Sequence, residues 1–281
     1  MSTWSFPVSG PIDLHVRLGF GSINVHANDD VGEASVTVNP RDPDSDYAAR
    51  TVVEMRQSTL VVHGPKPRGT LFDIPMFTGR RSERDALDVE ITVPAGTTMK
   101  LGSWGADIDV TGRAGTADIA SGSTAVTLEQ VDGDLRLRYG SGPARVKRVS
   151  GDVVVRAGSG DATFGEVAGS VEVGCGSGNL DVGVTGGRVR MRAGSGQMSI
   201  GAAGGDVDFT SGSGGVSIGL RRGQPARLDV VTGAGQVRSD LPVENHPPAD
   251  SARAITIKAR TGSGDVRIFR AEPAVPDDAV A

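Results

Sequence analysis

Cysteine and histidine are scarce in this chain of 281 residues, which contains one cysteine and four histidines. The single cysteine, Cys175, excludes an internal disulfide framework and offers no thiol cluster for a metal, which fits a reducing compartment. The histidines His15, His26, His63 and His246 lack the spacing of zinc ligands or of a nucleophile and its base. The composition therefore predicts no catalytic residue, no cofactor-binding residue and no metal ligand.

Long apolar runs and a basic excess are also missing. Glycine or a charged residue interrupts every apolar stretch before the roughly 18 residues that a membrane span needs. The first ten residues, MSTWSFPVSG, lack the basic start and apolar run of a signal peptide. Lysine and arginine number 29 against 34 acidic residues, without a basic cluster suited to a phosphate backbone. We expect a soluble, cytoplasmic protein with no membrane insertion and no nucleic-acid partner.

Glycine, in contrast, is abundant and periodic. Eleven glycines lie nine residues apart from Gly133 to Gly223 without a gap. A fixed short period indicates that the chain repeats one supersecondary unit and stacks the copies as a solenoid. We expect these glycines at corners, where positive φ costs glycine nothing and other residues a good deal.

Each nine-residue unit, counted from Ala106, carries apolar residues at its third and fifth positions, which predicts a strand with one face inward. The eighth position alternates between glycine and a bulkier residue such as Val131 or Val149, so the true coil has about eighteen residues, two strands and two unequal corners. The predicted inward residues are Ile108, Val110, Ala117, Ile119, Val126, Leu128, Leu135, Leu137, Ala144, Val146, Val153, Val155, Ala162, Phe164, Val171, Val173, Leu180, Val182, Val189, Met191, Met198, Ile200, Val207, Phe209, Val216 and Ile218.

The fold class that follows is all-β, a parallel β-helix or solenoid in which each strand pairs with its equivalents one coil away. We predict an N-terminal β cap with irregular coils over 1–103, a regular solenoid over 104–270 with an insertion at 240–253, and a disordered tail over 271–281. Looser strand-like alternation in the cap occurs at Ile12–Leu18, Ile23–Val25, Ala34–Val38, Thr51–Met55, Leu60–Val62 and Leu87–Val93.

The loop Gly64–Ala86 within the cap is rich in proline, glycine and arginine and encloses an apolar patch. The patch consists of Leu71, Phe72, Ile74, Met76 and Phe77. Such a patch is typical of a loop that folds back over the side or end of a solenoid, and a partner-binding loop is the alternative.

Two residues resemble catalytic groups without the context that catalysis needs. Cys175 occupies the seventh position of its unit, where sister units carry Ser121, Tyr139 or Ala157, so a structural thiol is the simpler interpretation. Ser217 lies in a GxSxG sequence, but a nucleophile elbow needs a sharp strand-to-helix turn and Ser217 falls in the middle of a predicted strand.

Calcium is the strongest metal candidate, because calcium β-rolls also repeat nonapeptides. Asp134, Asp152, Asp161 and Asp206 directly follow a repeat glycine. The same position holds proline, serine, asparagine, arginine and glutamine in other units, which argues against a repeated hard-cation site.

The outward positions of alternate strands form two different faces. One face carries Arg136, Arg156 and Arg190 among acidic residues, which favours pairing of charges between coils over a binding surface for an anionic polymer.

The coils of the Gly-Ser-Gly-Asp-Val type, preceded by LDVEITVPAG at Leu87–Gly96 and by Leu101-Gly102-Ser103, resemble the bacterial putative-adhesin family of β-strand-repeat proteins, a domain of unknown function. The resemblance covers about Ile12 to Ile268. It implies a right-handed parallel β-helix and supplies no catalytic residues.

We predict a non-enzymatic, adhesin-like scaffold or binding solenoid of unknown ligand, whose partner is a protein or a surface polymer. Two alternatives stay open: a β-helical polysaccharide-active enzyme, and a surface adhesin exported by an unrecognised route. An enzyme of that kind needs a groove with clustered acids, and short corners leave little wall for one.

Overall fold

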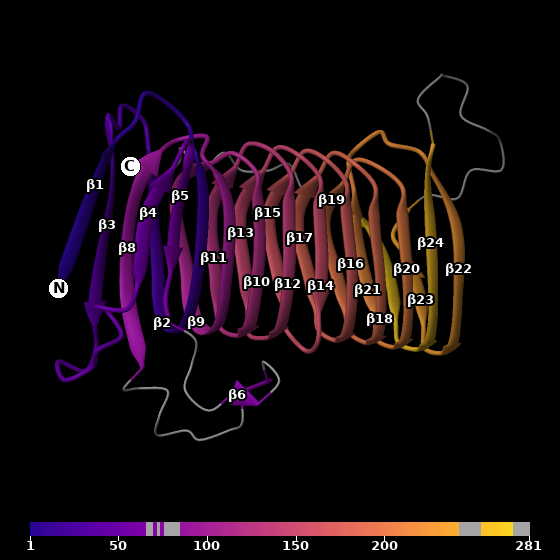
Figure 1. Ribbon diagram of the computed structural model, residues 1–281. Coiled ribbons are helices and arrows are strands. Elements are labelled where there is room, and N and C mark those ends of the chain that lie inside the picture. Colours follow the sequence, from indigo (N-terminus) through magenta and orange to yellow (C-terminus); the bar gives the residue numbers. More distant parts are fainter. Residues whose placement is uncertain (66–69, 72–73, 76–84, 242–253, 272–281) are drawn as a thin grey trace, which may run out of the picture.

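The computed structural model describes residues 1–65, 70–71, 74–75, 85–241 and 254–271, and these form a rod of stacked strands (Figure 1). The N-terminal strands lie at one end and the strand that begins at Ala226 at the other. The described residues are strands, turns and bends without a helix, so none of their segments is a helix able to cross a membrane. The predicted all-β solenoid is confirmed.

The rod has two faces, A and B, which are joined because β2 and β9 run around a corner and contribute to both. In order along the rod, face A contains β4 (Val52–Arg56), β5 (Thr59–His63), β2 (Asp13–Asn28), β9 (Thr98–Ala114), β10 (Ala117–Ser123), β12 (Leu135–Ser141), β14 (Val153–Ala157), β16 (Val171–Ser177), β18 (Val189–Ser195), β20 (Val207–Ser213), β24 (Ile255–Ser263) and β22 (Ala226–Ala234).

Face B contains β1 (Ser2–Pro7), β3 (Glu33–Pro40), β8 (Ala86–Pro94), the second halves of β2 and β9, β11 (Val126–Val131), β13 (Ala144–Val149), β15 (Ala162–Val167), β17 (Leu180–Thr185), β19 (Met198–Ala203), β21 (Val216–Leu220), β25 (Val266–Arg270) and β23 (Val237–Ser239). A separate hairpin consists of β6 (Thr70–Leu71) and β7 (Ile74–Pro75).

The register of the regular coils is eighteen residues, as predicted. Leu135 pairs in parallel with Ala117 on one side and with Val153 on the other. The same offset relates β13 to β15, where Val146 pairs with Phe164. Parallel pairing at a constant offset places equivalent positions of successive coils in columns along the rod.

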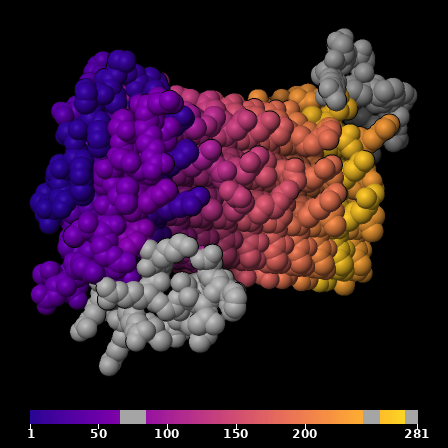
Figure 2. All heavy atoms as spheres, viewed as in Figure 1, coloured from indigo at the N-terminus to yellow at the C-terminus, as the bar shows by residue number. Residues whose placement is uncertain are grey.

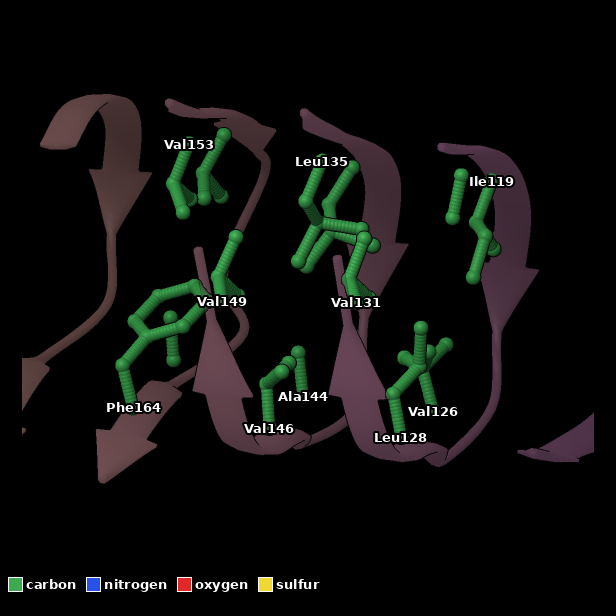
Figure 3. Packing of buried hydrophobic residues seen from close by; sticks show 14 of the residues in the cluster. Ile119, Val126, Leu128, Val131, Leu135, Ala144, Val146, Val149, Val153 and Phe164 are labelled. Atoms are coloured by element: carbon green, nitrogen blue, oxygen red, sulfur yellow. The ribbon is translucent and has the colours of Figure 1, made fainter. Parts of the chain in front are cut away.

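The core is one continuous apolar cluster, and all the inward residues predicted from the third and fifth positions are buried in it. The bulkier eighth-position residues are buried as well: Val131 and Val149 point from their corners into the space between the two faces (Figure 3). Phe164, which is 1% exposed, lies near Val149 and belongs to the next coil, where it is in register with Val146.

The prediction that the periodic glycines are needed for positive φ at corners is wrong for most of them. Of the eleven, only Gly142, Gly214 and Gly223 adopt positive φ. The others are required by stacking: a Cβ at Gly187 would lie 2.5 Å from the carbonyl oxygen of Gly169, one coil away. Each such glycine lets its backbone approach the equivalent glycine of the preceding coil, which any side chain would prevent.

The aspartates that follow the glycines hold neighbouring coils together. Asp134 Oδ1 accepts a hydrogen bond from the backbone N–H of Asp152 at 2.9 Å, and Asp152 Oδ1 accepts one from Ser170 at 2.7 Å. Asp161 and Asp206 do the same for Asn179 and Thr256, both at 2.8 Å. These carboxylates therefore satisfy backbone donors at the corners.

The order of the coils along the rod differs from their order in the sequence at the N-terminal end. The coil made of β5 and β8 lies outside β2, while β9, which follows it in the chain, pairs with the other side of β2. The segment Gly64–Ala86 connects β5 to β8 of this outer coil in the sequence. The antiparallel strands β1 and β4 end the two faces.

The C-terminal end shows the same inversion. The pair β24 and β25 contacts β20 and β21 on one side and β22 and β23 on the other. The terminal coil, β22 with β23, therefore precedes its inner neighbour in the sequence (Figure 1). Residues 242–253 and 272–281, and with them His246 and the predicted tail, lie outside the described residues.

Candidate functional site

A groove of about 650 Å³ lies on face A, at the end of the rod that carries the N-terminal strands. We call it the Trp104 groove. It is lined by Arg17, Leu18, Gly19, His63, Gly64, Pro65, Gly102, Ser103, Trp104, Ala120, Ser121, Gly122 and Arg138.

The groove results from a change of side-chain size along one row of the sheet. Arg17 of β2 pairs with Gly102 of β9, Gly102 pairs with Ala120 of β10, and Ala120 pairs with Arg138 of β12. Outward side chains of paired residues are neighbours on a sheet, so two small residues between two arginines leave a trough with a basic wall on either side.

Trp104 forms the aromatic part of the groove, and its side chain is 48% exposed. It stands in β9 at the corner between the two faces, followed by Gly105. Gly122 approaches the Trp104 carbonyl so closely that a side chain at position 122 would collide with it. The indole is therefore held by a fixed backbone, yet it is open to solvent on a surface where most apolar side chains are buried.

The groove is electropositive. Arg138 pairs with Asp118 at 2.8 Å, whereas Arg17 makes no ion pair within the described part of the chain. Burial lowers the pKa of the His63 imidazole below its usual value, and the nearby charges of Arg17 and Arg56 lower it further. None of the described lining residues is acidic. The site thus offers two guanidinium groups, and among the described residues Arg17 has no carboxylate partner whereas Arg138 has Asp118.

Polar floor groups complete the groove. Ser103 Oγ donates to the carbonyl of Ala106 at 2.8 Å and lies 3.4 Å from Ser121 Oγ. Ser121 in turn shares a hydrogen bond with Thr124. The hydroxyls are already engaged with protein atoms, so they orient the floor and leave the arginines and Trp104 as the groups open to a ligand.

The residues singled out in the sequence lie elsewhere. Cys175 is half-buried on β16, its Sγ donates to the Gly178 carbonyl at 3.5 Å, and burial raises the pKa of its thiol. Its register neighbours are Ala157 and Ala193. Ser217 is in the middle of β21, between Ser199 and Arg267. Neither residue has the neighbours that would activate a nucleophile, since a lowered thiol pKa or an adjacent base is required.

The arginines of face A mostly pair between or within coils, as favoured from the sequence. Arg156 pairs with Glu172 at 2.7 Å and Arg190 with Asp208 at 3.3 Å. Arg136 makes no ion pair among the described residues. The calcium candidates are spread over successive coils as backbone acceptors, and the part of the chain that the structure describes holds no group of three or more metal-ligating side chains.

The histidines are not all isolated in space. Arg17 of β2 pairs with His63 of β5, and His15 lies two residues earlier on the same side of β2. His26, at the far end of β2, contacts Thr111 through Nδ1 at 2.8 Å. Sequence reasoning missed the grouping of Trp104, Arg17 and His63 because these residues precede the regular repeat, where no period indicates which strands are neighbours.

The Gly64–Ala86 loop begins at the groove, since Gly64 and Pro65 line it. Leu71 and Ile74 pair in the antiparallel hairpin of β6 and β7. Phe72, Met76 and Phe77 lie outside the described residues, so the predicted folding of this apolar patch over the solenoid stays a prediction.

Comparison with known proteins identifies the family. The profile of the family described as Toastrack DUF4097 matches residues 44–274. No curated protein matches the chain. Among solved structures, a putative lipid binding protein from Parabacteroides distasonis ATCC 8503 is similar with 13% identity and a TM-score of 0.52, covering 94% of this chain and 96% of that chain. A putative adhesin from the same strain gives 12% identity and a TM-score of 0.41, covering 95% and 96%.

The likeness to the putative lipid binding protein supports the fold alone, because the identity is 13%. The family match is stronger, since it covers well over half of the sequence, from just before β4 to beyond β25. It also confirms the resemblance to an adhesin-like domain of unknown function that the repeat indicated. The chain belongs to the Toastrack DUF4097 family.

Proposed function

We propose that this chain is a non-enzymatic binding module that holds an acidic polysaccharide in the Trp104 groove. The observation that carries the proposal is the row Arg17, Gly102, Ala120, Arg138 beside the exposed Trp104. Sugar rings stack on exposed aromatic side chains, and guanidinium groups bind carboxylates through paired hydrogen bonds. The trough width set by two small residues suits an extended chain better than a bulky globular surface.

The absence of acidic residues from the described lining supports binding without hydrolysis. Glycoside hydrolases use two carboxylates on either side of the scissile bond. The groove instead presents Arg17, Arg138 and His63 around a small apolar floor. A polysaccharide lyase, which uses basic groups, is the enzyme alternative, and incubation of purified protein with bound polymer distinguishes it: we expect no shortening of the polymer.

Binding can be followed through Trp104 itself. The chain has two tryptophans, so Trp4→Phe leaves Trp104 as a single fluorescent reporter. We expect polygalacturonate to change its emission in a saturable manner and neutral dextran to leave it unchanged. Anionic lipid vesicles are a third arm, because lipid headgroups share the negative charge. A response to vesicles alone would replace the polysaccharide by a membrane surface as ligand.

Arg17→Ala is expected to weaken polygalacturonate binding by about tenfold, because it removes a groove cation that has no internal partner. Arg145→Ala is the matched control: Arg145 is exposed on β13 of face B and makes no ion pair within the described residues. Isothermal titration calorimetry measures both. Equal losses in the two variants would mean that the polymer binds arginines without using the groove.

Binding of an anion should tighten as the pH falls below about 6.5, the ordinary value for histidine. The lowered pKa keeps His63 neutral in the free groove, and a bound carboxylate favours its charged form, so binding takes up a proton. The same lowered pKa affects the stability of the free protein in the opposite direction. The unfolded chain binds the proton on His63 more tightly than the folded chain does, so the free energy of unfolding falls as the pH falls below about 6.5. His63→Asn should flatten the affinity profile between pH 5 and 8. An unchanged profile would remove His63 from the site.

A further inference from the structure

Among the described residues, inward side chains at the C-terminal end of the rod are more exposed than those at the N-terminal end, although both ends finish in edge strands. At the N-terminal end, Trp4, Phe6, Val53 and Met55 pack against the core from the last antiparallel strands. At the other end, β22 pairs only with β24 and β23 only with β25 among the described strands. Their outer edges leave backbone N–H and C=O groups without a strand partner.

The apolar core is exposed at the C-terminal end. Leu228 is in register with Ile257 and, one coil further in, Val207, which are 0% and 1% exposed, whereas Leu228 is 39% exposed. Val237 is in register with Val266, which is 0% exposed, but is itself 49% exposed. Both residues occupy inward columns of the solenoid. Within the described residues no further coil covers them, and a partner with the same cross-section would bury them.

We propose that a second copy of this chain covers the C-terminal end, so that two rods join through their β22–β23 coils. A two-fold axis normal to both faces at this end brings β22 beside β22 and β23 beside β23, each pair antiparallel. Both faces are satisfied by the same rotation, because the axis passes through both of them. The contact is self-complementary and closes as a dimer. Head-to-tail stacking would have to use the N-terminal end, where the inward side chains of β1 and β4 are already partly buried.

The charges of the edge suit an antiparallel copy. The outward side chains of β22 are Arg227, Asp229 and Val231, one of each sign and one apolar. Asp229 is paired with Arg260 of the neighbouring strand at 3.2 Å, and Arg227 makes no ion pair within the described chain. Antiparallel pairing reverses the order of the charges, so Arg227 of either copy comes near Asp229 of the other. The edge carries no lysine or proline that would block strand pairing.

The segment 242–253 is the competing occupant, since it connects β23 to β24. Its composition suits the role poorly: it has three prolines, which lack an N–H, and one large apolar residue, Val243. A second copy offers a complete strand edge and an equal apolar surface.

Sedimentation equilibrium of the full chain over a wide concentration range tests the proposal. We expect a monomer–dimer equilibrium whose dissociation constant rises about 100-fold in the double variant Leu228→Lys and Val237→Lys, because ammonium groups would face each other in a dry contact. Val52→Lys is the matched control, since Val52 is 49% exposed on the edge strand β4 at the opposite end. A dimer that Val52→Lys weakens equally, or a monomer at every soluble concentration, would overturn the proposal.

Cysteine crosslinking provides a second measurement that does not depend on the folding of the lysine variant. Arg227→Cys, Asp229→Cys and Val231→Cys are introduced singly into a Cys175→Ala background, in which alanine matches the neighbours of position 175. One of them should form an intermolecular disulfide on mild oxidation. Dimers without any crosslink would refute the β22 pairing. Dimerisation only after residues 242–253 are deleted would assign that segment as the native cover instead.

Discussion

Alanine at Gly187 is expected to lower the free energy of unfolding by about 3 kcal/mol, although it adds a single methyl group. The new Cβ would lie 2.5 Å from the carbonyl oxygen of Gly169 and 2.7 Å from the backbone nitrogen of Ser170. Both atoms belong to backbone, and the Gly187 N–H donates to that same Gly169 carbonyl at 3.0 Å. Relief of the collision therefore requires two coils to separate, which breaks a ladder hydrogen bond.

Urea unfolding followed by circular dichroism measures this effect. Gly32→Ala is the control, because a Cβ at Gly32 meets nothing within 4 Å and its backbone lies outside the positive-φ region. We expect the control to differ from the parent by about 0.5 kcal/mol or less. Equal stability of the two variants would mean that the periodic glycines serve the chain in some other way than close stacking.

Phe164→Ala is expected to cost about 4 kcal/mol, the largest effect of any single core change proposed for this chain. Phe164 is 1% exposed, and its register neighbours Val146 and Val182 are much smaller. The Phe164 ring is larger than the valine side chains before and after it in the same column, so it also fills space in the core beside the neighbouring coils (Figure 3). Its removal would leave a cavity that stiff parallel ladders on both sides cannot close.

Phe269→Ala is the control, because it removes an aromatic ring that is not fully buried. Comparison of the two variants therefore separates the effect of burial from the effect of losing a ring. Phe269 is half-buried on the outward side of β25 and lies beside Arg267, whose guanidinium carbon is 5.4 Å from the ring centre. We expect a loss of about 1 kcal/mol or less there. A cost at Phe164 as small as that at Phe269 would show that the core repacks freely, against the regular layers that the structure displays.

The regular part of this fold is predictable from sequence because one local rule is repeated. Every residue that the rule placed inward, from Ile108 to Ile218, is buried. The space-filling view shows the coils between the ends following one another along the rod in the order of the sequence (Figure 2). Each coil needs only its two neighbours, so a nearest-neighbour pattern contains almost all the information.

The ends and the groove were not predictable for the same physical reason. Strands with the same alternation of apolar and polar residues can pair with one another in several orders. The period therefore does not indicate that β24, rather than β22, contacts β20. The groove depends on Arg17 meeting Gly102, a contact between strands 85 residues apart along the chain, counting 102 − 17. The prediction that the periodic glycines adopt positive φ is wrong for most of them. It considers only the local backbone conformation, whereas these glycines are needed for the close contact between neighbouring coils.

The inverted order of the last coils constrains how the protein is made. Residues 226–239 leave the ribosome before 254–271, yet the later segment lies between them and the rest of the rod. Growth of the solenoid during synthesis can therefore proceed coil by coil only as far as β21, and the final two coils must assemble together once the chain has passed Arg270. Until then, β22 has no native partner and the edge of β20 is unpaired. In a chain truncated at that stage, β22 could pair directly with β20, which is not a native pairing.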